Sequence, residues 1–138
     1  MKVRAISNSG GQLPLSMLDS RWGLTRETSF PVAVGKEYIV YAITAIKDVF
    51  WYYLLDEHDL PYPVWYPSPL FQVSDGSVPA HWVVNYVSTD ASQDRVGTSL
   101  ITFKEWANDR SFYERLVEGR RELWLLSRMS EIFLPDGY

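Results

Sequence analysis

The two histidines of this 138-residue chain are the first candidates for chemistry, because one of them lies in a run of carboxylates. Asp56, Glu57 and Asp59 surround His58, and nowhere else in the sequence could a histidine and carboxylates bind a metal ion or share a proton. The four residues are consecutive, so their side chains diverge, and no second histidine is near in sequence. Three interpretations stay open: a metal or proton-sharing site, a solvated acidic loop after a strand, or a negative patch that speeds association with a basic partner.

The second histidine, His81, has no recognisable catalytic partner in the sequence. A catalytic role would need a nucleophile and an orienting group that only the fold can bring to it. The serine-nucleophile, phosphate-binding and dinucleotide-binding motifs are absent, and we interpret Gly10-Gly11 as a turn because it lacks the following helix and lysine of a phosphate cradle. The chain has no cysteine, which excludes disulfides, thiol nucleophiles and thiolate metal sites. We therefore expect a protein that is not an enzyme and binds no cofactor or metal; a small enzyme or ligand-binding domain that uses His58, His81 and nearby carboxylates is the alternative.

Aromatic residues are abundant and offer a second kind of site. The series comprises Trp51, Tyr52, Tyr53, Tyr62, Trp65, Tyr66, Phe71 and Trp82. Such a series can form a stacking platform, but aromatic residues of a small β domain more often form its core. Tyr62, Trp65 and Tyr66 are exceptions, because the prolines around them fix the backbone in advance and because Tyr and Trp are favoured interface anchors. The candidate partner-binding residues are Asp56, Glu57, His58, Asp59, Tyr62, Trp65 and Tyr66; for the three aromatic residues, packing over a sheet edge is the alternative.

The elements that must position these residues begin with a hairpin. Residues 38–46 and 49–55 are β-branched and aromatic runs, which predict two antiparallel strands joined at Lys47-Asp48 by a turn whose type stays open. Both strands carry large residues on both faces, so we expect both faces to be covered. Four prolines in residues 61–69 predict an extended segment on a sheet edge or surface, and residues 70–73 and 81–87 predict further strands.

The rest of the chain completes an α+β fold. Residues 2–6 predict a first strand, residues 12–29 a long loop that could be functional or structural, and residues 100–101 a last strand. Thr102 and Glu105 match a capping box for a first helix, Asp109 can cap a second, and residues 120–134 have helical spacing, although residues 120–125 could form a strand. We expect an antiparallel bent sheet or SH3-like β-barrel of about five or six strands, followed by two or three C-terminal helices. One domain should span residues 1–138, with a β-rich core at 30–103 and a helical part at 104–134.

Charge and hydropathy limit the partners. The formal net charge of −4 argues against a nucleic-acid surface, which needs clustered Lys and Arg, and favours a basic or neutral protein partner. The polar stretch at residues 7–12 interrupts any signal peptide, and no segment approaches the roughly 20 apolar residues that cross a bilayer. We therefore expect a cytoplasmic protein without nucleic-acid or membrane binding, and the oligomeric state stays open.

Several short motifs together resemble a known group of proteins. They are Glu37-Tyr38-Ile39-Val40-Tyr41-Ala42, Tyr53-Leu54-Leu55-Asp56-Glu57, Pro67-x-x-Leu70-Phe71-x-Val73-x-Asp75-Gly76, Pro79-x-x-Trp82 and Phe103-x-Glu105-Trp106-Ala107. The pattern covers roughly residues 30–117 and is similar to small single-domain bacterial proteins of undefined function, which we associate with immunity proteins of polymorphic or contact-dependent toxin systems. The resemblance implies a cytoplasmic protein that binds one cognate toxin domain and blocks it by occlusion; it assigns no toxin-contact residue. The net negative charge of the chain favours a basic toxin domain. A stand-alone SH3-like module that grips a peptide with residues 62–66 is the third hypothesis.

Overall fold

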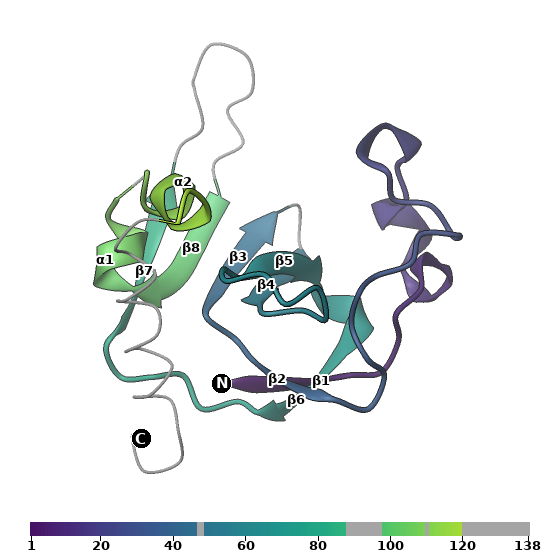
Figure 1. The fold of residues 1–138 in the computed structure, drawn as a ribbon, viewed down its shortest axis with the longest axis horizontal. Coiled ribbons are helices and arrows are strands. Elements are labelled where there is room, and N and C mark those ends of the chain that lie inside the picture. Colours follow the sequence, from purple (N-terminus) through teal and green to yellow (C-terminus); the bar gives the residue numbers. More distant parts are fainter. Residues whose placement is uncertain (47–48, 88–97, 110, 120–138) are drawn as a thin grey trace.

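The computed structural model describes residues 1–46, 49–87, 98–109 and 111–119, which form two antiparallel sheets and two short helices (Figure 1). The smaller sheet has the strand order β2-β1-β6, and the larger has the order β5-β4-β3-β8-β7. The strands of the smaller sheet are β1 (Lys2–Ala5), β2 (Glu37–Ile39) and β6 (Phe71–Asp75). Those of the larger sheet are β3 (Ala42–Ile46), β4 (Val49–Leu54), β5 (Val64–Pro67), β7 (Trp82–Val87) and β8 (Thr98–Phe103). The α+β class is confirmed, with more strands than expected.

The predicted hairpin is present, but its first strand is divided between the two sheets. Ile46 pairs with Val49, so only two residues separate β3 from β4. Residues 38–46 are not one strand as predicted, because the chain bends at Val40 and Tyr41 and β2 pairs with β1 while β3 pairs with β4 and β8. The backbone amides at the bend still donate hydrogen bonds, from Val40 to Met1 O at 3.0 Å and from Tyr41 to Tyr53 O at 2.9 Å.

Neither sheet closes on itself within the described residues. The larger sheet has β5 and β7 as its edges, and the smaller sheet has β2 and β6. The proline-rich segment at residues 61–69 contributes β5, so its predicted place at a sheet edge is confirmed. The N-terminal strand β1 lies at the centre of the smaller sheet, so β structure begins well before residue 30.

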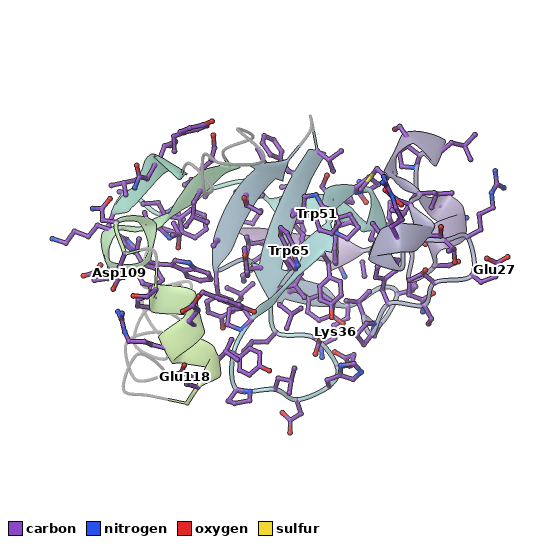
Figure 2. All side chains as sticks on the ribbon, turned by 90° about the horizontal axis from the view of Figure 1, so that it is seen from above. Glu27, Lys36, Trp51, Trp65, Asp109 and Glu118 are labelled. Carbon is purple, nitrogen blue, oxygen red and sulfur yellow. The ribbon has the colours of Figure 1, made fainter. Side chains whose placement is uncertain are left out.

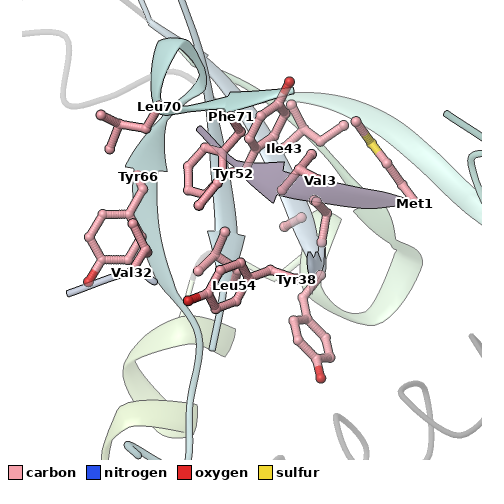
Figure 3. Close-up of a cluster of buried hydrophobic side chains, with 14 of the residues drawn as sticks. Met1, Val3, Val32, Tyr38, Ile43, Tyr52, Leu54, Tyr66, Leu70 and Phe71 are labelled. Carbon is pink, nitrogen blue, oxygen red and sulfur yellow. The ribbon is translucent and has the colours of Figure 1, made fainter. Parts of the chain in front are cut away.

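The core lies between the two sheets, and a second layer covers the other face of the larger one. Tyr52 on β4 contacts Phe71 on β6, with ring centroids 5.9 Å apart, and Leu54 and Val3 are fully buried there (Figure 3). On the opposite face of β4, Tyr53 lies 5.0 Å from Trp106 of the first helix, measured between ring centroids. Both faces of the hairpin are therefore covered over much of their length, as predicted from the large side chains at both odd and even positions of its strands.

Two short helices follow β8 directly: α1 (Lys104–Ala107) and α2 (Phe112–Val117). The predicted capping box is wrong, because Thr102 is a fully buried residue of β8 whose hydroxyl donates to Tyr41 O at 2.7 Å, and the cap position of α1 falls on Phe103. The cap position of α2 falls on Ser111 and not on Asp109 as predicted, and Asp109 Oδ1 instead accepts from the backbone N and the hydroxyl of Ser111 at 3.0 Å each. The predictions for residues 120–134 and for most of the connection at residues 88–98 lie outside the described residues.

The long loop at residues 12–29 has more local order than the sequence predicted. It contains single 3-10 turns at Leu15–Met17 and Ser20–Trp22, and another at Gly10–Gln12 precedes it. An antiparallel bridge between Ser9 and Ser29 closes its base. The bridge joins the two ends of the loop to each other, and the loop is held on the core by apolar side chains: Leu13 is buried in the core, and Met17, Leu18 and Leu24 pack against it.

Candidate interaction site

The acidic run at residues 56–59 forms the loop that leaves β4, and its first carboxylate is buried. Only 1% of the Asp56 side chain is exposed; Oδ2 accepts a hydrogen bond from the hydroxyl of Tyr66 on β5, and Oδ1 accepts one from the backbone N of His58 at 2.8 Å. Burial raises the pKa of Tyr66, and its hydrogen bond to Asp56 raises it further. Tyr66 is itself buried against Phe30, with ring centroids 6.1 Å apart. Asp56 and Tyr66 were predicted to be contact residues, but in the structure they anchor the loop.

Glu57 makes the second anchor, on the opposite side of the loop. Its Oε2 accepts from Lys36 Nζ at 2.7 Å and from the Tyr38 hydroxyl at 2.9 Å, while its backbone N donates to Pro31 O at 2.9 Å. The hydrogen bond from Lys36, followed by that from Tyr38, lowers the pKa of the Glu57 carboxyl group. The side chain remains exposed, so a partner can still reach it.

His58 and Asp59 form the exposed tip of this loop. Asp59 has a φ of +59°, a left-handed conformation that Asp tolerates better than most residues. His58 Nδ1 lies 3.8 Å from Asp56 Oδ2, which is beyond hydrogen-bonding distance. Among the described residues no three His, Asp or Glu side chains come together in a way that could hold a metal ion. The tip therefore offers two polar side chains to a partner and no assembled metal site.

The strand order separates the two histidines. His58 follows β4 and His81 precedes β7, and β3 and β8 lie between these strands. Neighbouring strands are about 4.8 Å apart, so three spacings place the two strands about 14 Å from each other. Both histidines are exposed. The joint site that the enzyme hypothesis requires is not supported by this arrangement.

Trp65 on β5 is the most accessible of the predicted aromatic contacts. Its side chain is 36% exposed, it lies opposite Tyr53 of β4 in the strand register, and the two rings are stacked with centroids 6.0 Å apart. Trp51, also on β4, contacts Trp65 with centroids 5.0 Å apart, and Figure 2 shows the two indoles next to each other on the sheet. The pairing of β4 with β5 thus forms a partly exposed tryptophan pair at the sheet edge.

A chain of ring contacts connects this pair to the acidic loop. Tyr62, at the end of the loop, contacts Tyr113 of α2 with centroids 6.4 Å apart, and Tyr113 contacts Tyr53 with centroids 5.3 Å apart. The Tyr113 hydroxyl donates to Pro63 O at 2.8 Å, and burial raises its pKa to about 12. We call the surface made by Glu57, His58, Asp59, Tyr62 and Trp65 the acidic–aromatic edge. Its backbone is held from both sides, by the anchors of the loop and by α2.

Some residues of this arrangement were not identified as site residues from the sequence. Trp51 belonged to the aromatic series but was assigned to the core, and Lys36 and Tyr113 were not singled out. Trp51 and Tyr53 are two residues apart on β4 and so lie on the same face of the sheet, which the sequence alone could have indicated. The contact of Trp51 with Trp65 depends on the register of β5, which no local pattern provides.

The fold and the site together define an α+β protein with an exposed acidic and aromatic sheet edge. Compared with protein-family models, with curated proteins and with solved structures, the chain matches none of them. In the part of the chain that the structure describes, no helix has the length and apolar character needed to cross a membrane. We therefore infer a function from the residues of this chain alone.

Proposed function

We propose that this chain is a non-enzymatic protein-binding protein that acts as an immunity protein, neutralising a cognate bacterial toxin in the cytoplasm by occlusion. The sequence motifs quoted above suggest this class. The observation that carries the proposal is the exposed Trp65, which is stacked on Tyr53 beside Trp51 and lies on the same sheet edge as an anchored acidic loop. Tryptophan and tyrosine in a rigid setting are frequent hot spots of protein interfaces.

The rigidity of the acidic–aromatic edge supports binding by contact. Asp56 and Glu57 fix the loop from two sides, and Pro63 and Pro67 are fully buried at either end of β5. A surface that is already ordered loses little conformational entropy when a partner binds, so more of the contact energy remains as affinity. The exposed carboxylates of the loop favour a basic partner and speed its approach.

Binding to the toxin encoded immediately upstream of the gene, where there is one, tests the proposal. Wild-type protein should form a stable complex with the toxin domain and protect cells from it. Trp65→Ala should weaken binding about 30-fold or more, as hot-spot truncations do. Because Trp65 is partly exposed, the same change should lower the free energy of unfolding by only about 1–2 kcal/mol, and not by the roughly 3–5 kcal/mol of a core residue.

Phe50 provides a matched control for this experiment. Its side chain is 52% exposed, and it lies on the same hairpin but on the opposite face of β4 from Trp51. Phe50→Ala should leave toxin binding and protection unchanged. If the wild-type protein neither binds nor protects, the immunity proposal falls, and an equal loss of binding in both variants would rule out the acidic–aromatic edge as the contact surface.

An SH3-like peptide-binding module is the second candidate, and the tryptophan pair favours it. Surfaces lined with aromatic rings are the usual receptors for proline-rich peptides in the polyproline II conformation. The closed barrel implied by this alternative remains a proposal. Asp59→Asn, which keeps a residue type that tolerates the positive φ, should slow association with a basic toxin several-fold. It should leave binding of an uncharged proline-rich peptide unchanged, so the charge dependence of binding distinguishes the two candidates.

A further inference from the structure

The indole of Trp65 is covered by other rings from one side only. It is stacked on Tyr53, with 25° between the ring planes, and it contacts Trp51, and both of these residues belong to β4 (Figure 2). Among the described residues no strand lies beyond β5, which is an edge of the larger sheet. The exposed 36% of Trp65 therefore includes the side of the indole that points away from β4.

The rings behind Trp65 are themselves held in place. Tyr53 contacts Trp106 of α1, with centroids 5.0 Å apart and the ring planes at 72°, and Tyr113 of α2, with centroids 5.3 Å apart and the planes at 64°. The side of the Trp65 indole that faces β4 is thus supported by a second layer of aromatic residues. A ring that is fixed in this way can receive a ligand group without first being ordered.

The charges along this part of the chain favour a cationic ligand. From residue 48 to residue 94 the sequence has no lysine or arginine, whereas the loop at residues 56–59 is acidic. Lys36 reaches this loop from another segment, but its Nζ donates to Glu57 at 2.7 Å and lies 5.3 Å from the centroid of the Tyr38 ring. The protein thus already holds one cation with a carboxylate and an aromatic ring together. Among the described residues, no cation lies over the indole at the sheet edge.

We propose that the outward side of Trp65 receives an arginine side chain of the protein partner. This inference rests on the proposed function, because it names the group of the partner that meets the acidic–aromatic edge. The face of an aromatic ring is electrically negative, tryptophan binds cations best among the aromatic residues, and arginine is the commoner cation in such contacts. The guanidinium group is planar, is more weakly hydrated than an ammonium group and stacks on rings, so lysine should be the weaker ligand.

Two short peptides test this inference without the toxin. They are N-acetylated, amidated tripeptides with either arginine or citrulline between two glycines, and citrulline has nearly the shape of arginine without its charge. Each is added to the full chain up to about 100 mM at constant ionic strength, and the indole N–H signals are followed by NMR. The dissociation constant for the arginine peptide should be about 3- to 10-fold lower than that for the citrulline peptide.

The position of the shifted signals identifies the site. The indole signals of Trp65 and Trp51 should move, whereas that of the buried Trp82 on β7 should stay in place and serves as the internal control. A lysine tripeptide of the same design should bind more weakly than the arginine peptide. These measurements use the wild-type chain, so they decide the matter even where a variant does not fold.

Variants separate the ring from the carboxylates. Trp65→Leu keeps an apolar side chain and removes the ring, so the preference for arginine over citrulline should disappear, whereas Trp65→Phe should keep part of it. Phe50→Leu is the matched control, because Phe50 is exposed on the opposite face of β4, and it should keep the full preference. Asp59→Asn should keep most of it, because the ring and not this carboxylate holds the guanidinium group.

The outcomes distinguish this inference from the proposed function. Equal affinity for the two tripeptides, or a preference that Asp59→Asn removes and Trp65→Leu keeps, would overturn the arginine contact. Tighter binding of an uncharged proline-rich peptide at the same indole would overturn it as well. If the toxin is bound and Trp65→Ala weakens that binding while the tripeptides bind equally, only the arginine contact falls. If the chain prefers arginine but neither binds the toxin nor protects cells, only the immunity proposal falls.

Discussion

The buried contact between Asp56 and Tyr66 gives the sharpest test of how the acidic loop is held. Tyr66→Phe removes the hydroxyl that donates to Asp56 Oδ2 and leaves the aromatic ring in place against Phe30. The Asp56 side chain is only 1% exposed, so water cannot readily replace the lost donor, and the amide of His58 remains as its hydrogen-bond donor among the described residues. The perturbation is therefore confined to one hydrogen bond to a buried carboxylate.

The expected cost follows from that geometry. A hydrogen bond to a charged group contributes about 1.5–3 kcal/mol to stability, and here the unsatisfied acceptor stays buried. For a chain of this length, such a loss should lower the melting temperature by about 5–15 °C. Tyr62→Phe is the matched control, because Tyr62 lies on the same loop, is only partly buried, and its hydroxyl makes no hydrogen bond with the described residues. It should change stability by less than about 0.5 kcal/mol.

Urea unfolding of Tyr66→Phe, Asp56→Asn and the double variant measures the coupling between the two groups. If the hydroxyl and the carboxylate act on each other, the double variant should be at least about 1 kcal/mol more stable than the sum of the single changes predicts. Additive single effects, or a loss for Tyr66→Phe no larger than that for Tyr62→Phe, would refute the conclusion that this pair anchors the loop.

Two further predictions concern other parts of the fold. A Cβ at Gly10 would lie 1.8 Å from Thr25 O, so Gly10→Ala should cost about 2 kcal/mol or more in urea unfolding, whereas Gly11→Ala should be near neutral; equal effects would contradict this packing. The hydrogen bond from Arg115, then those from Ser111, lower the Asp109 pKa from 3.8 to about 2. A lowered pKa stabilises the fold above the unfolded value, so the difference in unfolding midpoint between wild type and Asp109→Asn should shrink as the pH falls from about 4 to 2. A constant difference would contradict this.

The sequence predicted the elements of the fold well where the signal was local. The hairpin of β3 and β4, the edge position of the proline-rich segment and the strand at residues 82–87 all follow from residue type and spacing. The bend at Val40 and Tyr41 could not be predicted, because both residues suit a strand and the break depends on which strands pair with each half. The capping-box prediction for Thr102 failed in a similar way. The capping motif is a local pattern, whereas the burial of Thr102 in β8 depends on the tertiary fold.

The candidate site shows the same division between local and tertiary information. Trp65 and Tyr66 are adjacent aromatic residues, and from the sequence both were predicted to be partner contacts. Adjacent residues of a strand point to opposite faces of the sheet, so one of the two side chains had to enter the core. The pairing of β5 with β4 determines which of the two faces the core. Asp56 is a comparable case. A run of acidic residues predicts solvent exposure, and only the tertiary fold brings the hydroxyl of the buried Tyr66 to the Asp56 carboxylate.

The anchors also change the balance between charge and aromatic contact at the acidic–aromatic edge. Of the three carboxylates in the loop, Asp56 is buried and Glu57 is paired with Lys36, so Asp59 is the one that makes no ion pair with the described residues. The negative potential offered to a partner is therefore smaller than the sequence suggests, and added salt should screen it readily because the loop is exposed. For a partner that binds this edge as proposed, we expect most of the affinity to come from Trp65 and its neighbours and Asp59 to act chiefly on the association rate. Binding that Asp59→Asn abolishes and Trp65→Ala spares would reverse this assignment.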